Sequence, residues 1–401
     1  MPRLPGAAFV AALACLLPLT ATGAASAAAG PSAPAAAAAG VTPPDASAVP
    51  RLPAPTGPYA VGRSTFHLVD HGREDPWVPE ADGRELMVDI SYPARRGAGR
   101  PAAYATTEEV RLLLEDRKLD GVIPAEKLSA TRTNSRVDAP PVPGRHPLVV
   151  LSPGFSVSRY TLTALAEELA GRGYVVASID HAYESVGTLF PGGRMLTCVA
   201  CRKAKTPEDF KAAVAGRGKD ASFVLDRLTG TQSPWKYSYM IDRHRIGMAG
   251  HSLGGASAAA TMAGDRRVLA GVNMDGAFQE GVPAGGLGGR PFMMLGTDDE
   301  IHRPGGRDTS WDTAWRRLDG WKRWLTVAGA DHFSFSDVPF LAEQVLPPGT
   351  PGPGAGLPGP RSVEITRAYV AAFFDLHLRR IPQPLLAGPT PNNPEVKFNR
   401  P

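Results

Sequence analysis

A serine flanked by glycines lies where a predicted strand meets a predicted helix. The stretch RIGMAGHSLGGASAAA, residues 245–260, reads as a strand, a Gly-His-Ser-Leu-Gly corner and a helix of small residues. In Gly250-x-Ser252-x-Gly254 the serine occupies a sharp turn that exposes its hydroxyl, and a side chain at either glycine would collide with neighbouring backbone. The amino end of the helix directs a partial positive charge at the same point, which favours an oxyanion. The alternative is an ordinary Gly-rich turn.

A serine hydroxyl is a weak nucleophile near neutral pH, so Ser252 needs a general base. Three histidines follow it in the chain: His302, His332 and His377. His377 falls inside a predicted terminal helix, where a packing role is expected, and His302 remains a candidate after GTDDEI. His332 follows the predicted strand RWLTVAGA, in a loop that can carry its imidazole over the serine. We therefore predict that His332 is the base.

The acid that orients the base has candidates at the ends of two strands. Asp275 ends AGVNMDG, the strand after the serine helix, and Asp298 and Asp299 end the next strand, FMMLGTDDE. Either strand end could present a carboxylate to His332, and spacing alone does not choose between them. Asp331, adjacent to the histidine, is badly placed to orient it.

The surrounding pattern predicts an α/β fold that would position these groups. The apolar runs at 146–155 and 174–181 do not alternate, which is typical of strands covered on both faces. Helical stretches at 158–173, 207–230 and 362–380 alternate with the strands. We therefore expect a mainly parallel sheet.

Several stretches together resemble the α/β-hydrolase superfamily, and more narrowly the plasma-type platelet-activating-factor acetylhydrolase family of secreted and bacterial esterases. They are LMVDISYPA, LVVLSPGF, YVVASIDH, GHSLGG, NMDG and GADHFSFSD. In that family the acid follows the strand after the serine helix, so the resemblance favours Asp275, 23 positions after Ser252, over Asp299. His332, 80 positions after Ser252, also fits. The resemblance implies an α/β-hydrolase fold with helices on both faces of the sheet.

Two backbone amides should form an oxyanion hole. One belongs to Leu253, the residue after the nucleophile. The other is expected from Phe155, in the turn after VVLSPG, and the resemblance assigns a donor to that turn. The alternative is a Pro-Gly bend without a catalytic part. This scheme describes a serine ester hydrolase that forms an acyl-enzyme, and it implies no metal or organic cofactor.

The substrate is less constrained. The resemblance implies short or oxidised acyl chains on phospholipids, or small soluble esters. Two apolar groups could form a lip or cleft, or could equally be core: Leu189, Phe190, Met195 and Leu196 in the first, and Trp311, Trp315, Trp321 and Trp324 in the second. The alternatives are a cutinase-like hydrolase of polyesters or triglycerides, a peptidase with the same triad, and a non-catalytic binding protein of this fold.

The amino-terminal sequence predicts export. Arg3 precedes the apolar run GAAFVAALACLLPL and small residues with an Ala-x-Ala site, so residues 1–27 are expected to be a secretory signal peptide. Residues 28–57 are Ala- and Pro-rich and are expected to be a disordered linker before a catalytic domain at 58–401. We therefore predict a secreted, extracellular protein.

The mature chain would keep two cysteines, Cys198 and Cys201. A short-loop disulfide suits an exported protein, whereas a redox pair lacks its usual strand and helix context and one pair cannot bind zinc alone. The 401 residues carry 43 basic and 39 acidic side chains, a formal net charge of +4, without a dense Lys/Arg run. Nucleic acid is therefore not an expected partner, while transient contact with a lipid surface stays open.

Overall fold

The computed structural model describes residues 49–347, 350, 352 and 356–400. The predicted signal peptide and most of the predicted linker lie outside this part. Residues 49–57 contradict the linker prediction, because they pack on the domain: Leu52 is 1% exposed in an apolar cluster, and the Thr56 N–H donates to the Glu168 carboxylate at 2.9 Å. The folded domain therefore begins before the predicted boundary at residue 58.

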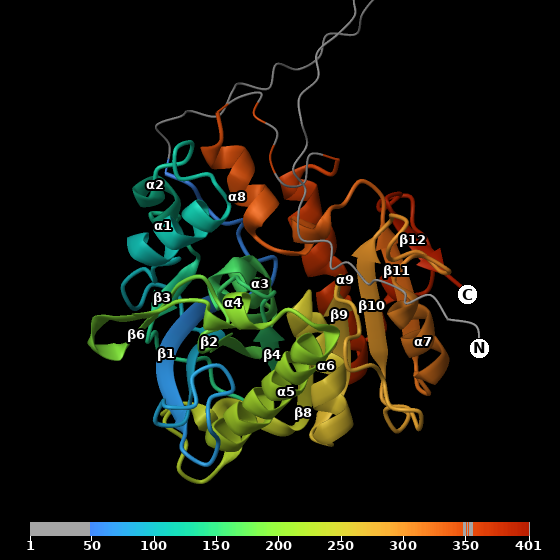
Figure 1. The fold of residues 1–401 in the computed structure, drawn as a ribbon, viewed down its shortest axis with the longest axis horizontal. Coiled ribbons are helices and arrows are strands. Elements are labelled where there is room, and N and C mark those ends of the chain that lie inside the picture. The colour runs from blue at the N-terminus through green and yellow to red at the C-terminus, as the bar shows by residue number, and fades with distance from the viewer. Residues whose placement is uncertain (1–48, 348–349, 351, 353–355, 401) are drawn as a thin grey trace, which may run out of the picture. The chain divides into compact units, whose positions relative to one another are not determined.

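A ten-stranded sheet forms the centre of the domain (Figure 1), in the order β12-β11-β10-β9-β8-β4-β5-β2-β1-β3. Neighbouring strands from β11 to β5 run parallel, whereas β2 is antiparallel to β1 and β5, and β12 is antiparallel to β11. The strands are β1 Ala60–Asp70, β2 Arg84–Ala94, β3 Ser135–Val137, β4 His146–Ser152, β5 Val175–His181, β8 Ile241–His251, β9 Val268–Met274, β10 Phe292–Thr297, β11 Lys322–Val327 and β12 Val396–Asn399. A separate hairpin pairs β6 Thr188–Phe190 with β7 Arg194–Leu196.

Helices cover both faces of this sheet. The α-helices are α1 Thr107–Asp116, α2 Ala125–Ser129, α3 Thr163–Gly171, α4 Val199–Lys203, α5 Pro207–Thr229, α6 Leu253–Gly264, α7 Thr309–Arg317, α8 Val338–Val345 and α9 Gly359–Arg379. One apolar layer joins the sheet to α5, α6 and α7, and a second joins it to α3 and α9. Successive β4 residues alternate between the layers, Leu148 in the first and Val149 in the second, so both faces of the strand are apolar. The predicted α/β-hydrolase fold is confirmed.

The aromatic residues considered for a substrate cleft or lip pack mainly against the core. Trp311 and Trp324 are fully buried, with ring centroids 5.7 Å apart, so for them the packing alternative is correct. Trp315 packs partly exposed against the same layer and Trp321 against the other. Phe190 is 2% exposed and packs in the β6–β7 region, so for it too the core alternative is correct. These rings contribute apolar burial rather than a substrate surface.

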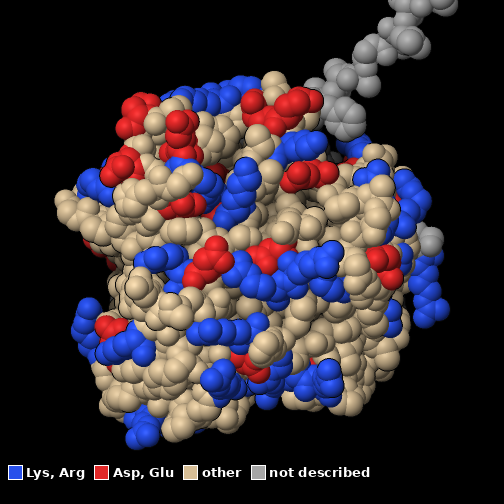
Figure 2. Space-filling view, turned by 90° about the horizontal axis from the view of Figure 1, so that it is seen from below, with Lys and Arg blue, Asp and Glu red and all other residues tan. Residues whose placement is uncertain are grey.

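One face of the domain exposes many basic side chains. Seen from below, the surface carries more Lys and Arg than Asp and Glu (Figure 2). Arg145, Arg266 and Arg290 directly precede β4, β9 and β10 or lie within two residues of their first positions. Because the first residues of neighbouring parallel strands meet at one edge of a sheet, charges scattered in the sequence gather there. Within the described residues, no helix is both long and apolar enough to cross a membrane.

Candidate active site

Ser252 lies on a strained turn between β8 and α6. Its backbone angles, φ 54° and ψ −122°, fall in a region that side-chain-bearing residues rarely adopt. A Cβ atom at Gly254 would lie 2.0 Å from the Ser152 carbonyl oxygen, and one at Gly250 would lie 2.2 Å from Gly254 backbone atoms. The Ser252 N–H donates to Met274 at 2.8 Å, which ties the turn to β9. The flanking glycines are therefore sterically required, as the sequence pattern predicts.

The imidazole of His332 connects Ser252 to Asp275. Nε2 lies 3.0 Å from the Ser252 hydroxyl oxygen, and Nδ1 lies 2.6 Å from Oδ2 of Asp275. A carboxylate can only accept, so Nδ1 carries the hydrogen and, in the neutral ring, Nε2 is left as the acceptor for the hydroxyl. The structure thus brings together the three predicted side chains in the arrangement that activates a serine.

Asp275 is buried but remains charged because of its neighbours. It is 2% exposed, and its Oδ1 accepts a hydrogen bond from the Thr297 N–H at 2.7 Å. Nδ1 of His302 lies 3.2 Å from the same oxygen. Burial alone would raise the pKa of Asp275, but the charge of His302 and the hydrogen bonds from His332 and Thr297 outweigh it, so that the pKa is lowered. A charged carboxylate is therefore available to hold His332.

The other candidate acids make different contacts. The Asp299 carboxylate accepts from the Thr297 hydroxyl and from the N–H groups of Ile301 and His302. Asp298 pairs with Arg303 and Lys397. Neither carboxylate contacts His332 in the described part of the chain. The geometry therefore selects Asp275 between the two strand ends.

The other candidates for the base and the acid make contacts that serve packing or helix capping. His302 is buried behind Asp275 and is not in contact with Ser252, so it does not occupy the place of the base. His377 packs on Trp321, with ring centroids 4.5 Å apart, in the packing role expected for it. Asp331 caps the short 3-10 helix that begins at His332, where its side chain accepts from the Phe333 N–H.

Sequence reasoning missed the part played by His251, the residue before the nucleophile. Its Nε2 lies 2.6 Å from the His332 carbonyl oxygen, and the two rings are 4.7 Å apart between centroids. Burial, together with the charge of His332, lowers the pKa of His251 to about 3, so the ring is neutral and Nε2 is the donor. The signal was a histidine inside the Gly-x-Ser-x-Gly corner, but its contact lies 81 residues away.

The predicted oxyanion-hole residues lie beside Ser252. A Cβ atom built on Gly154 would be 3.4 Å from Cβ of Ser252, so the turn that follows β4 contacts the serine turn. The N–H groups of Phe155 and Leu253 donate no hydrogen bond within the described residues. The side chains of both residues pack in one apolar cluster. Two unpaired amides next to the hydroxyl suit the binding of an anionic oxygen.

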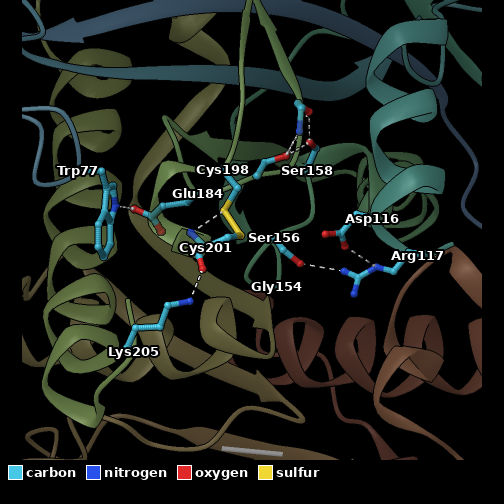
Figure 3. The surroundings of a disulfide bond; sticks show 12 residues. Trp77, Asp116, Arg117, Gly154, Ser156, Ser158, Glu184, Cys198, Cys201 and Lys205 are labelled. Atoms are coloured by element: carbon cyan, nitrogen blue, oxygen red, sulfur yellow. Dashed lines mark hydrogen bonds and ion pairs between the residues drawn. A yellow bond between two sulfur atoms is a disulfide. The ribbon is translucent and has the colours of Figure 1, made fainter. Parts of the chain in front are cut away.

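A disulfide joins Cys198 to Cys201 at the start of α4. Its residues belong to the same apolar cluster as Phe155 and Leu253. Figure 3 shows the disulfide near Gly154 and Ser156, with Arg117 directed at the Ser156 hydroxyl, 2.8 Å away. The short loop therefore helps to pack the wall that carries the predicted oxyanion donors. No group of three His, Cys, Asp or Glu side chains suited to a metal ion occurs among the described residues.

A serine turn of this kind, at the carboxyl end of a central strand in a mainly parallel sheet, defines the α/β-hydrolase class. Comparisons with known proteins agree. Residues 111–190 match the family model described as platelet-activating factor acetylhydrolase, isoform II. The chain is 29% identical over 388 residues to a probable 1-alkyl-2-acetylglycerophosphocholine esterase of Arthroderma benhamiae, a match that covers 88% of this chain and 95% of the relative.

Two further proteins narrow the assignment. The platelet-activating factor acetylhydrolase of Cavia porcellus is 23% identical over 225 residues, half of this chain and 51% of the relative. The solved structure of ferulic acid esterase from Streptomyces cinnamoneus is 43% identical, with a TM-score of 0.78, and the match covers 88% of this chain and all of that one. The chain therefore belongs to the α/β-hydrolase esterases related to platelet-activating-factor acetylhydrolase, and it is a carboxylic ester hydrolase.

Proposed function

We propose that the chain is a secreted serine esterase whose nucleophile, base and acid are Ser252, His332 and Asp275. The observation that carries this proposal is the position of one imidazole, with Nε2 3.0 Å from the serine hydroxyl and Nδ1 2.6 Å from the buried carboxylate. Removal of the hydroxyl proton by Nε2 needs no rearrangement of these three side chains.

The reaction proceeds through an acyl-enzyme. Oγ of Ser252 bonds to the ester carbonyl carbon while Nε2 of His332 accepts its proton, and the carbonyl oxygen becomes an oxyanion. The amides of Phe155 and Leu253 donate to that oxyanion. As the intermediate collapses, the alcohol leaves with the proton from Nε2. Water then repeats the attack with His332 as base and frees the acid, while Asp275 stabilises the transient imidazolium.

Short-acyl or phospholipid-type esters are the proposed substrates. The family match and the names of the fungal and guinea-pig relatives support an acetyl ester on a glycerophosphocholine. An ester of ferulic acid is the second candidate, favoured by the 43% identity to the Streptomyces enzyme over its whole length. A cutinase-like action on polyesters or triglycerides, with transient contact at a lipid surface, is the third. These differ in the acyl group that must fit beside Phe155 and Leu253.

A labelling experiment tests the nucleophile. The mature protein is treated with a fluorophosphonate, which reacts with activated serines, and the labelled peptide is identified by mass spectrometry. Label is expected on the peptide that contains residues 250–255 and is expected to be absent in Ser252→Ala. Label elsewhere, or full hydrolysis of p-nitrophenyl acetate by Ser252→Ala, contradicts the proposed nucleophile.

The substrate class is tested by competition among four esters. They are p-nitrophenyl acetate, p-nitrophenyl palmitate, methyl ferulate and a 1-alkyl-2-acetyl-glycerophosphocholine. The proposal expects the highest kcat/KM for the acetyl phospholipid or the short ester. A preference for methyl ferulate would move the assignment to the second candidate, and a preference for palmitate to the third. Cleavage in a peptide library would instead support a peptidase.

Export is tested on protein recovered from the culture medium. The basic start, apolar run and Ala-x-Ala site support a signal peptide, and the disulfide suits an oxidising compartment. Intact mass should show an amino terminus within a few residues of Ala27. Recovery of the full-length chain in the cytosolic fraction alone contradicts this part of the proposal.

A further inference from the structure

We propose that Arg217 is a positioning residue that orients the peptide unit carrying the Phe155 oxyanion donor. Arg217 lies in α5, is 1% exposed and contacts none of the three proposed triad side chains. Nη1 donates to the Pro153 carbonyl at 2.5 Å, and Nη2 donates to the Gly154 carbonyl at 3.5 Å. One guanidinium thus binds two successive carbonyls of the turn beside Ser252. The inference rests on the proposed function of that turn.

The geometry of a peptide bond connects these contacts to the oxyanion hole. The carbonyl of Gly154 and the N–H of Phe155 belong to one planar unit, and in the trans form they point in opposite directions. A donor that binds the carbonyl from α5 therefore sets the direction of the N–H. Without it, the turn could rotate this peptide unit, because Gly154 has no side chain to restrict it.

The other side of Phe155 is held by Glu184. The carbonyl oxygen of Glu184 accepts from the Ser156 N–H at 2.9 Å, and its carboxylate accepts from Nε of Arg217 at 2.7 Å. The two residues therefore fix the peptide units before and after Phe155 and are joined to each other. Figure 3 shows the Glu184 carboxylate directed at the Trp77 indole, which donates to it at 3.0 Å.

A buried network of charges holds the side chains of Arg217 and Glu184 in place. Arg84 donates to Glu184 at 2.7 Å and also pairs with Asp75 and Asp220. Arg84, Asp75 and Asp220 are at most 1% exposed, and Arg73 reaches Asp220 from the rim. Arg73 also pairs with Asp70, so Arg73, Arg84 and Arg217 face four carboxylates, and Glu184 compensates the charge on Arg217 directly. A buried ion network is weak evidence for added stability, since apolar packing can do as well. Preorganised donors, in contrast, contribute directly to the stability of an oxyanion.

Two variants, Arg217→Gln and Arg217→Lys, separate positioning from structural bracing. The test compares kcat and KM for p-nitrophenyl acetate with the affinity for a trifluoromethyl ketone, whose serine adduct carries an oxyanion. We expect Arg217→Gln to lower kcat roughly 10- to 100-fold with little change in KM. The affinity for the trifluoromethyl ketone should fall by a similar factor. Arg217→Lys, which can reach one carbonyl, should recover part of both losses.

Arg367→Gln is the matched control. Arg367 is also a buried arginine, 6% exposed and paired with Glu168, but it lies in α9 and has no contact with the turn. The Arg367→Gln variant should have a lower melting temperature than the wild type, with unchanged kcat and ketone affinity. Folded Arg217→Gln with kcat within threefold of wild type, or a loss of kcat with unchanged ketone affinity, overturns the inference. If Arg217→Gln does not fold, Arg217→Lys is used instead: the inference expects a smaller loss of kcat with a matching loss of ketone affinity, and a loss of kcat with unchanged ketone affinity overturns it.

The inference and the proposed function fail in different ways. If Ser252→Ala keeps its activity, Ser252 is not the nucleophile, and there is no longer a reason to expect an oxyanion hole at this turn. An inactive Ser252→Ala beside a fully active Arg217→Gln leaves the serine mechanism in place and rejects only the role of Arg217.

Discussion

The Asp275 carboxylate lies 2.6 Å from Nδ1 of His332, although 57 residues separate the two in the chain. Asp275 follows β9 and His332 follows β11, and parallel strands place their carboxyl ends at one edge of the sheet. The same carboxylate is held by the Thr297 N–H, which comes from the end of β10, the strand between them. The carboxyl ends of three neighbouring strands thus meet at one acidic group.

Replacement of Asp275 by Asn is expected to lower kcat by roughly a thousandfold or more, because an amide NH₂ would favour the wrong imidazole tautomer. Asp299→Asn should change kcat by less than tenfold, since its carboxylate contacts Thr297 and nearby N–H groups rather than His332. Steady-state kinetics with p-nitrophenyl acetate measures both. Equal losses in the two variants, with both proteins folded, would reject Asp275 as the orienting acid.

Gly254 and Gly264 lie at opposite ends of α6 and offer a matched pair of substitutions. Gly254→Ala should cost at least about 2 kcal/mol of unfolding free energy, because the new Cβ would lie 2.0 Å from a backbone oxygen. Gly264→Ala has open space and should be neutral or stabilising by about 0.5 kcal/mol. Urea unfolding followed by circular dichroism gives both values. A stable, active Gly254→Ala protein would contradict the close contact at the turn.

The buried His251 should make the fold sensitive to acid. Its folded pKa is about 3, whereas an unfolded histidine titrates near 6.5, so the unfolded chain binds the extra proton first as the pH falls. The contribution of this group is complete above pH 6.5 and is lost progressively below it. Between pH 7 and pH 5 the loss should be about 2 kcal/mol.

His251→Gln keeps a donor but does not titrate, so its unfolding free energy should fall about 2 kcal/mol less over the same interval. Urea titrations at the two pH values provide the comparison. Parallel pH dependence in the variant and the wild type would show that His251 is not buried as a neutral ring.

The disulfide between Cys198 and Cys201 should contribute to activity as well as to stability. Closing so short a loop contributes about 2 kcal/mol in the chain-entropy picture. The double variant Cys198→Ser/Cys201→Ser loosens the cluster around Phe155 and Leu253, so kcat/KM should fall roughly 10-fold while the protein stays folded at 25 °C. Kinetics and thermal unfolding measure the two effects. Unchanged kcat/KM would mean that the loop does not support the oxyanion wall.

Local patterns explain what could be predicted. The Gly-x-Ser-x-Gly pattern from Gly250 to Gly254 predicts the strained turn at Ser252, because the turn is formed by residues that are neighbours in the chain. Likewise, apolar strands alternating with helices predict the mainly parallel sheet and the loop position of His332. The linker boundary was wrong because residues such as Leu52 pack on distant partners, and the sequence left Phe190 open between lip and core because its burial depends on a short hairpin that packs it inward.

The sequence by itself predicted the candidate nucleophile, the class of fold and the set of candidate acids, since each depends on residues close together in the chain. Only the tertiary structure decided that Asp275 rather than Asp299 contacts His332, that His251 binds the His332 carbonyl, and that Arg217 holds the turn at Gly154 from 63 residues away. It also gave the face drawn in Figure 2 more Lys and Arg than Asp and Glu, an excess that the near-balanced composition does not indicate. Such contacts depend on directions and distances between elements, which spacing along the chain does not encode.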